Sequence, residues 1–131
     1  MESLRVDALE AAILQLKTGF MEASKHPNND LMRDGVIQRF EYTMDLAWKL
    51  MHRYLKLLQI DETTIRSKND IFREAARLKI INNAEAWIGY YAARNETAHD
   101  YNKNKATLVY EKAKLFLPDV TLLLEVLRNV D

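Results

Sequence analysis

Cysteine is absent from this chain of 131 residues, and glycine and proline are scarce, with three and two copies. Without cysteine the chain can form no disulfide, no thiolate metal site and no cysteine nucleophile. An all-β sandwich or barrel of this size needs many tight turns, which rely on glycine, proline and Asn-Gly pairs. No apolar run approaches the roughly 18 residues of a membrane span. These absences argue against an all-β fold and against a membrane partner.

Net charge is absent as well, because 19 Lys and Arg residues balance 19 Asp and Glu residues. A neutral chain has no overall field that attracts nucleic acid. The balance is uneven along the chain, since residues 66–114 hold ten basic and six acidic side chains. This local excess fits a solvated helix face about as well as a functional one. The charged N-terminal sequence is unlike a signal peptide, so we expect a cytoplasmic protein.

Apolar residues recur at steps of three and four along nearly the whole chain, which is the period of an α-helix. We expect one domain over residues 1–131, an all-α, compact, up-and-down bundle of about five helices. The predicted helices cover about 3–24, 31–59, 68–79, a stretch from residue 82 that loses regularity near 98–104, and 104–128.

Capping residues and proline indicate where these helices begin and end. Asp30 is expected to cap the second helix, Ser67 the third and Asn82 the fourth. Pro118 predicts a kink or a fresh start in the fifth helix. The second helix is apolar over about half its circumference, so it must bury two faces. Either it is surrounded inside its own domain, or its second face binds a partner.

Histidine is the side chain best suited to proton transfer near neutral pH, and the chain has only three. His26 lies in a Pro- and Asn-rich loop and His52 in the middle of a helix, where structural roles are expected. His99 lies in the stretch 94–102, which combines a guanidinium, an imidazole, carboxylates and a phenol. The helical pattern fails here, and irregular ends of elements often carry reactive side chains. An ordinary polar helix end is the alternative.

Three kinds of chemistry fit the stretch 94–102. Metal-free cleavage of RNA needs proton transfers from imidazole and a guanidinium that binds the phosphate, which Arg94 and His99 offer. The second histidine for such a reaction would come from a two-fold dimer. Glu96 and His99 also form a Glu-x-x-His string, as in carboxylate-bridged di-iron bundles, although the chain has only one. The third hypothesis is that the segment only docks a partner or a nucleotide.

The string Arg-x4-His-x-Tyr, formed by Arg94, His99 and Tyr101, resembles the motif of the HEPN superfamily. Residues 36–49 resemble the characteristic helix of its HepT-like toxins, also called nucleotidyltransferase substrate-binding proteins. Two such segments in the right order make the resemblance more specific than the short motif alone. It covers essentially the full length of the chain.

The resemblance implies a symmetric homodimer in which the arginine and histidine of both protomers line one cleft. It implies a metal-independent endoribonuclease with Arg94 and His99 as catalytic residues, Asn95 and Glu96 as supporting residues, and no cofactor or metal. A minimal nucleotidyltransferase would act as antitoxin by transferring AMP to Tyr101. The alternative is a non-catalytic substrate- or nucleotide-binding subunit of a separate nucleotidyltransferase. The neutral charge departs from the basic character expected of a protein with an RNA substrate.

Overall fold

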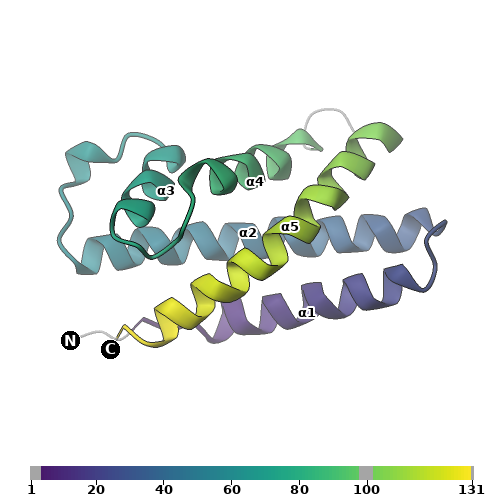
Figure 1. Ribbon diagram of the computed structural model, residues 1–131, viewed down its shortest axis with the longest axis horizontal. Helices are drawn as coiled ribbons and strands as arrows, with labels where there is room; N and C mark the ends of the chain where they lie inside the picture. The colour runs from purple at the N-terminus through teal and green to yellow at the C-terminus, as the bar shows by residue number, and fades with distance from the viewer. Residues whose placement is uncertain (1–3, 98–101, 131) are drawn as a thin grey trace.

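The computed structural model describes residues 4–97 and 102–130 (Figure 1). Over these residues the chain forms five α-helices and one short 3-10 turn, with no β-strand. The all-α expectation is therefore confirmed, and the helices α1, α2, α4 and α5 run alternately up and down (Figure 1). Their bounds are α1 Asp7–Ser24, α2 Asp30–Leu57, the 3-10 turn Glu62–Thr64, α3 Lys68–Arg77, α4 Ala84–Glu96 and α5 Lys103–Arg128.

Helix α2 is the centre of the bundle, because it packs against α1, α3, α4 and α5. Its buried side chains extend from Val36 to Leu55. Packing inside its own domain therefore accounts for the buried side of this helix, and a partner on its exposed side stays a prediction. A few large apolar side chains at its surface stay exposed, among them Leu31 and Tyr42. No helix in the described ranges is both long enough and apolar enough to span a membrane.

Aromatic rings join α2, α4 and α5 at the centre of the core. The ring of Phe116 on α5 meets Phe40, Trp87 and Tyr90 in edge-to-face geometry, with centroid distances of 5.1, 5.4 and 5.5 Å. Such pairs add about 0.5–1.5 kcal/mol each beyond the burial of apolar area. The hydroxyl of Tyr90 donates to Asp119, and burial together with this carboxylate raises the Tyr90 pKa. This cluster fixes α4 against α2.

Two of the predicted helix caps are wrong by one residue. Asn29, not Asp30, caps α2, and Asn83, not Asn82, caps α4; each side chain accepts a 3.1 Å hydrogen bond from a backbone N–H three residues later. Asparagine and aspartate are nearly equal as caps, so neighbouring candidates cannot be ranked by residue type. Ser67 precedes α3 as predicted, but its hydroxyl makes no cap hydrogen bond within the described residues.

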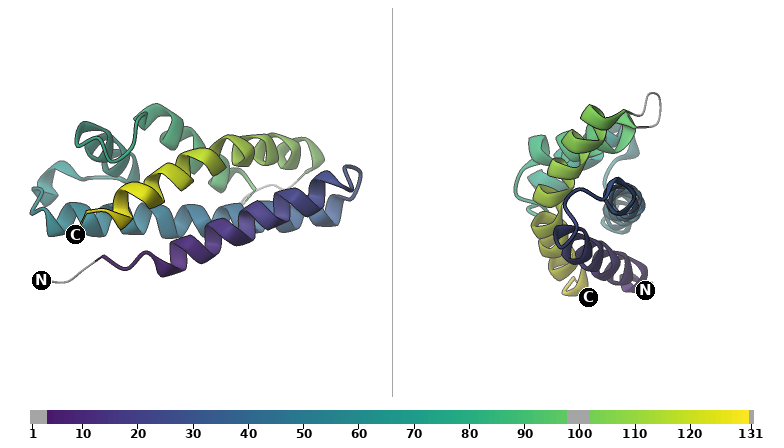
Figure 2. Two further views of the ribbon diagram at one scale, coloured as in Figure 1. Left: turned by 60° about the horizontal axis from the view of Figure 1, so that its bottom comes forward. Right: turned by 90° about the vertical axis from the view of Figure 1, so that its right-hand side faces the viewer.

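Of the two outcomes predicted at Pro118, a kink or a fresh helix start, the fresh start is wrong. Helix α5 continues from Lys103 to Arg128 with Pro118 inside it, as one ribbon (Figure 2). Proline removes one hydrogen bond of the helix. The buried residues Phe116 and Val120 hold both sides of this turn in the core. The hydroxyl of Tyr90 also donates to the Leu115 carbonyl at 3.2 Å. Packing therefore outweighs the local preference of proline.

Replacing the central ring tests this account of the core. Phe116→Ala is expected to lower the free energy of unfolding by about 3–5 kcal/mol, because it leaves a cavity between three helices. Leu115→Ala is the matched control, because the Leu115 side chain, next to Phe116 in the sequence, is 59% exposed. This substitution should change the free energy of unfolding by about 0.5 kcal/mol or less. Urea unfolding followed by circular dichroism measures both. Equal effects of the two substitutions would contradict the central role of the Phe116 ring.

Candidate functional site

Arg94 lies in the last turn of α4, where two carboxylates of α2 hold its guanidinium. Its Nε and Nη2 atoms donate to the two carboxylate oxygens of Asp45, each at 3.0 Å. Its Nη1 atom donates to Oε2 of Glu41 at 3.1 Å. The planar fork of arginine matches a carboxylate in this two-bond arrangement, which fixes direction as well as distance. Arg94 is therefore oriented by contacts that do not involve a ligand.

Helix geometry explains why these side chains meet. Glu41 and Asp45 are four residues apart on α2, so they share one face of that helix, and Thr97, the C-cap of α4, follows Arg94 by three residues and lies on the same side. The Thr97 hydroxyl, just after α4, donates to the same Glu41 oxygen at 3.2 Å. Glu41 thus ties α2 both to the arginine and to the end of α4. The chain then enters the segment that contains His99.

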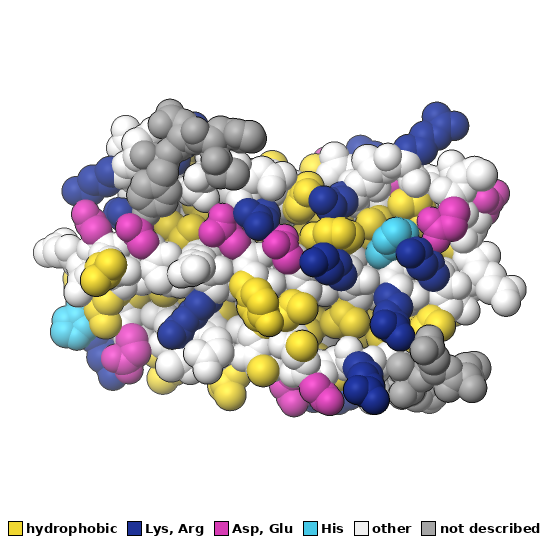
Figure 3. Space-filling model, turned by 180° about the vertical axis from the view of Figure 1, so that it is seen from behind, with side chains coloured by type: hydrophobic (Ala, Val, Ile, Leu, Met, Phe, Trp, Pro, Cys, Tyr) yellow, Lys and Arg dark blue, Asp and Glu magenta, His cyan; other side chains and the backbone are white. Residues whose placement is uncertain are grey.

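The electrostatics of this site favour a permanently charged arginine. The hydrogen bond to Asp45 raises the Arg94 pKa above its usual range, and the charges of Asp45 and Glu41 add to this effect, whereas partial burial opposes it. The side chains of Arg94, Glu41 and Asp45 are 26%, 24% and 33% exposed, so water reaches all three. The three side chains together carry one positive and two negative charges, so their net charge is negative. Figure 3 shows acidic and basic side chains side by side across the back of the molecule.

The other predicted site residues are placed as follows. Asn95 and Glu96 end α4 with exposed side chains, and Glu96 lies 4.0 Å from the Lys105 ammonium at the start of α5. His99 and Tyr101 lie outside the described residues. The structure therefore brings Arg94, Asn95 and Glu96 together at one end of α4. The Glu-x-x-His metal hypothesis stays a hypothesis, because one of its two ligands lies outside the described part of the chain.

The remaining histidines have the structural surroundings expected for them. Nε2 of half-buried His52 lies 3.5 Å from a carboxylate oxygen of Glu62 in the 3-10 turn. His26 is exposed in the loop between α1 and α2.

Sequence reasoning gave no role to Glu41 and Asp45. Both lie in the stretch 36–49, and the signal that could have found them is their spacing, two carboxylates four residues apart in the middle of a helix. A single sequence does not reveal which cation such a pair faces. The partner, Arg94, is about fifty residues away and reaches the pair only through the packing of α4 on α2.

Comparison with known proteins relates this geometry to a family. A family model described as "Nucleotidyltransferase substrate binding protein like" matches residues 4–129, nearly the whole chain. The chain belongs to this family. Within it, the chain is 32% identical to the probable ribonuclease HepT of Haemophilus influenzae, over 98% of this chain and 94% of that protein. The HepT-like, HEPN-type identity expected from the motifs is thereby confirmed.

Two solved structures related to this chain have the same fold. One is a Haemophilus influenzae protein whose structure is described as revealing the fold of a substrate-binding domain of a nucleotidyltransferase. It is 31% identical to this chain and superimposes with a TM-score of 0.85. The match covers 95% of this chain and all of that one, at 100%. A Thermus thermophilus protein is 26% identical with a TM-score of 0.76, over 92% of this chain and 99% of its own.

A double-mutant cycle tests whether the carboxylates hold Arg94. Combining Arg94→Gln with Asp45→Asn should give a coupling energy of roughly 1–3 kcal/mol in urea unfolding, because two hydrogen bonds between partly buried charges are lost together. The matched control is the more exposed pair Arg77 and Glu74, which has two bonds of 2.9 and 2.8 Å and an arginine that is 60% exposed. Its coupling should stay below about 1 kcal/mol. Equal coupling in the two cycles would contradict the assignment.

Proposed function

We propose that the chain is a metal-independent endoribonuclease that acts as a homodimer, the toxin half of a pair with a minimal nucleotidyltransferase. The observation that carries this proposal is the similarity to the probable ribonuclease HepT over 98% of the chain. The arrangement of Arg94 supports it. Glu41 and Asp45 take three of the five N–H groups of the guanidinium, which leaves two for phosphate oxygens.

The proposed reaction divides the work between Arg94 and His99. One His99 imidazole takes the proton of the ribose 2′-hydroxyl, whose oxygen then attacks the neighbouring phosphorus. The bond from phosphorus to the 5′-oxygen breaks, and the His99 of the second protomer protonates that oxygen. The products are a 2′,3′-cyclic phosphate and a 5′-hydroxyl. The two Arg94 side chains stabilise the extra negative charge of the phosphorane, which exists only near the transition state. Asn95 and Glu96 support this site.

A dimer is part of the proposal because one chain supplies only one histidine in the motif. The surface of α1 and α2 offers apolar area for it. Leu14, Leu31 and Tyr42 are 63%, 81% and 60% exposed. A groove between these two helices is lined by four small residues, Ala8, Ala11, Ala12 and Gly35, and by the longer side chains of Gln15, Gln38, Arg39 and Tyr42. Two copies of such a face can pack closely around a two-fold axis.

Cleavage without metal is the first test. Purified protein in excess EDTA should cut a labelled RNA into products that end in a 2′,3′-cyclic phosphate. Arg94→Ala and His99→Ala should each lower the rate at least about a hundredfold, since removal of a proton-transfer group or a charge-stabilising group has effects of that size. His52→Ala is the matched control and should keep the rate. Full activity of either site variant would contradict the catalytic assignment.

Silencing by a nucleotidyltransferase is the second part of the proposal. AMP on Tyr101, two residues after His99, would add bulk and negative charge beside the site and so exclude a phosphate substrate. Tyr101→Phe should remain a nuclease after incubation with the cognate nucleotidyltransferase and ATP, whereas the parent should gain the mass of one AMP and lose activity. Intact mass and cleavage assays measure both. Modification of Tyr101→Phe with loss of its activity would place the acceptor elsewhere.

A second candidate function is a non-catalytic subunit that binds substrate for a separate nucleotidyltransferase. Two observations favour it: the description of the related Haemophilus influenzae structure as a substrate-binding domain, and the excess of carboxylates around Arg94. An unmodified dimer that cuts no RNA would favour this candidate, and cleavage that depends on His99 would overturn it.

A further inference from the structure

The proposed cleavage site has an electrostatic problem. Arg94 is accompanied by the carboxylates of Glu41 and Asp45, so its described surroundings carry more negative than positive charge. An RNA strand is a chain of phosphates, and its affinity comes mainly from cations that contact them. Because the whole chain is neutral, those cations must be concentrated on one part of the surface.

The second half of α2 carries such a concentration, which ends before Asp61 and Glu62 at the 3-10 turn. Residues 46–60 include three basic side chains, Lys49, Arg53 and Lys56, and no acidic one. All three are exposed, and they follow one another at steps of four and three, so they lie on one side of the helix. This side continues the face that carries Glu41 and Asp45. The acidic and the basic parts of α2 are thus consecutive along one surface.

Aromatic rings lie between these two parts. Trp48 follows Asp45 by three residues on α2, and Tyr91 precedes Arg94 by three residues on α4, so both rings are one helical turn from the arginine site. Both are half-buried and pack against the core with part of their surface. Tyr91 is near enough to Arg94 to act on its pKa.

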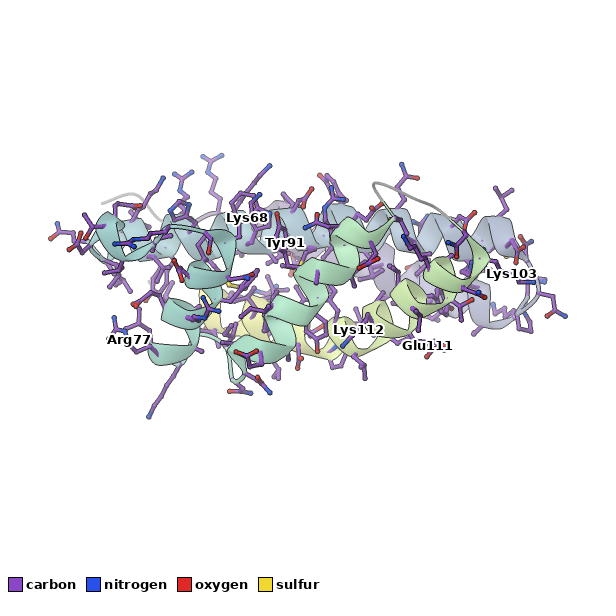
Figure 4. All side chains as sticks on the ribbon, turned by 90° about the horizontal axis from the view of Figure 1, so that it is seen from above. Lys68, Arg77, Tyr91, Lys103, Glu111 and Lys112 are labelled. Carbon is purple, nitrogen blue, oxygen red and sulfur yellow. The ribbon has the colours of Figure 1, made fainter. Side chains whose placement is uncertain are left out.

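A lysine covers both rings. Lys68, the first residue of α3, places its ammonium 4.5 Å from the Trp48 ring centroid and 5.2 Å from that of Tyr91. The ammonium of Lys49 lies 5.7 Å from the Trp48 centroid. Figure 4 shows Lys68 beside Tyr91, where α3 meets α4. Two cations and two aromatic rings from three helices therefore converge next to Arg94.

We propose that Trp48, Tyr91, Lys68 and Lys49 form a subsite for a nucleotide of single-stranded RNA next to the phosphate held by Arg94. A base stacks on the exposed part of the rings, and Lys68 and Lys49 pair with the adjoining phosphates. This inference rests on the proposed ribonuclease function and names where its substrate binds. In this proposal the subsite binds the RNA strand. The carboxylates of Glu41 and Asp45 orient the Arg94 side chain.

The energetics favour exchange of the lysine for a base. The contact of an exposed cation with an aromatic ring favours the contacting state roughly two- to fivefold over the separated state. Stacking of a base on an aromatic side chain is worth roughly five- to a hundredfold. The displaced ammonium keeps a partner as well, because a long lysine side chain reaches the phosphate of the same nucleotide. Stacking is tolerant of sequence, so this subsite selects single strands and not particular bases.

The test uses an RNA decamer that is 2′-O-methylated throughout, which removes the nucleophile and prevents cleavage. Lys68→Gln should weaken its binding about three- to tenfold and reduce the slope of log affinity against log salt by about 0.7, the value for one phosphate contact. Lys114→Gln is the matched control, since Lys114 on α5 lies 5.0 Å from the Tyr110 ring centroid, outside the subsite. It should bind like the parent. Equal losses in the two variants overturn the subsite.

Tryptophan fluorescence reports the stacking directly. The chain has two tryptophans, and Trp87 is only 2% exposed, so quenching by the decamer should come from Trp48. Trp48→Leu should lose the quenching and weaken binding at least about fivefold, whereas Trp48→Phe should keep most of the affinity because phenylalanine also stacks. Unfolding curves from Trp87 check that each variant is folded. Equal affinities of Trp48→Leu and Trp48→Phe overturn the stacking.

Cleavage assays separate this inference from the proposed function. If the parent cuts unmodified RNA and Lys68→Gln raises KM with little change in kcat, both stand. If the parent cuts RNA and Lys68→Gln behaves like Lys114→Gln, the nuclease stands and the subsite fails. If the parent cuts no RNA but binds the decamer through Trp48 and Lys68, the subsite stands alone. A change in oligomeric state of Lys68→Gln with unchanged decamer affinity assigns the surface to a second copy and overturns the proposal.

Discussion

The packing of α4 against α2 is the constraint on which the rest of the site depends. The ring of Phe116 touches rings from both helices, and these contacts hold the last turn of α4 over the middle of α2. Only then can Arg94 reach Asp45 and Glu41. The site is therefore a product of the core, because the carboxylates and the arginine come from helices about fifty residues apart in the chain.

The ion pairs around Arg94 and the core beneath them have different roles. The core supplies most of the stability, and the partly exposed ion pairs around Arg94 add only the roughly 1–3 kcal/mol expected for their coupling. These ion pairs fix the orientation of the Arg94 side chain, because a guanidinium held by two carboxylates loses rotational freedom before any ligand binds. A preoriented charge stabilises a transition state without reorganising during the reaction. The same carboxylates weaken attraction for a phosphate, so orientation of the arginine and attraction of the substrate are competing demands.

The helices and the family could be predicted from the sequence, but the side chains that bind Arg94 could not. Periodicity predicts the five helices because each of them buries apolar residues at helical spacing in one continuous core. The caps of α2 and α4 were mispredicted by one residue, since neighbouring asparagine and aspartate side chains compete for a cap. The fresh helix start at Pro118 was wrong, since tertiary packing overrides a proline. Glu41 and Asp45 could not be assigned, because a carboxylate pair on a helix has no visible partner until the helices are packed.

The charges along α2 suggest how these demands are reconciled. The face that begins with Glu41 and Asp45 continues into a stretch with three basic residues and no acidic one. A strand bound along this face would meet its cations and aromatic rings first and the arginine at one end. Attraction and chemistry are then separate in space although they share one helix. In the proposed nuclease, a negative group attached near Arg94 would add to the excess of carboxylates there, so a single modification would strongly repel the phosphates of an RNA strand.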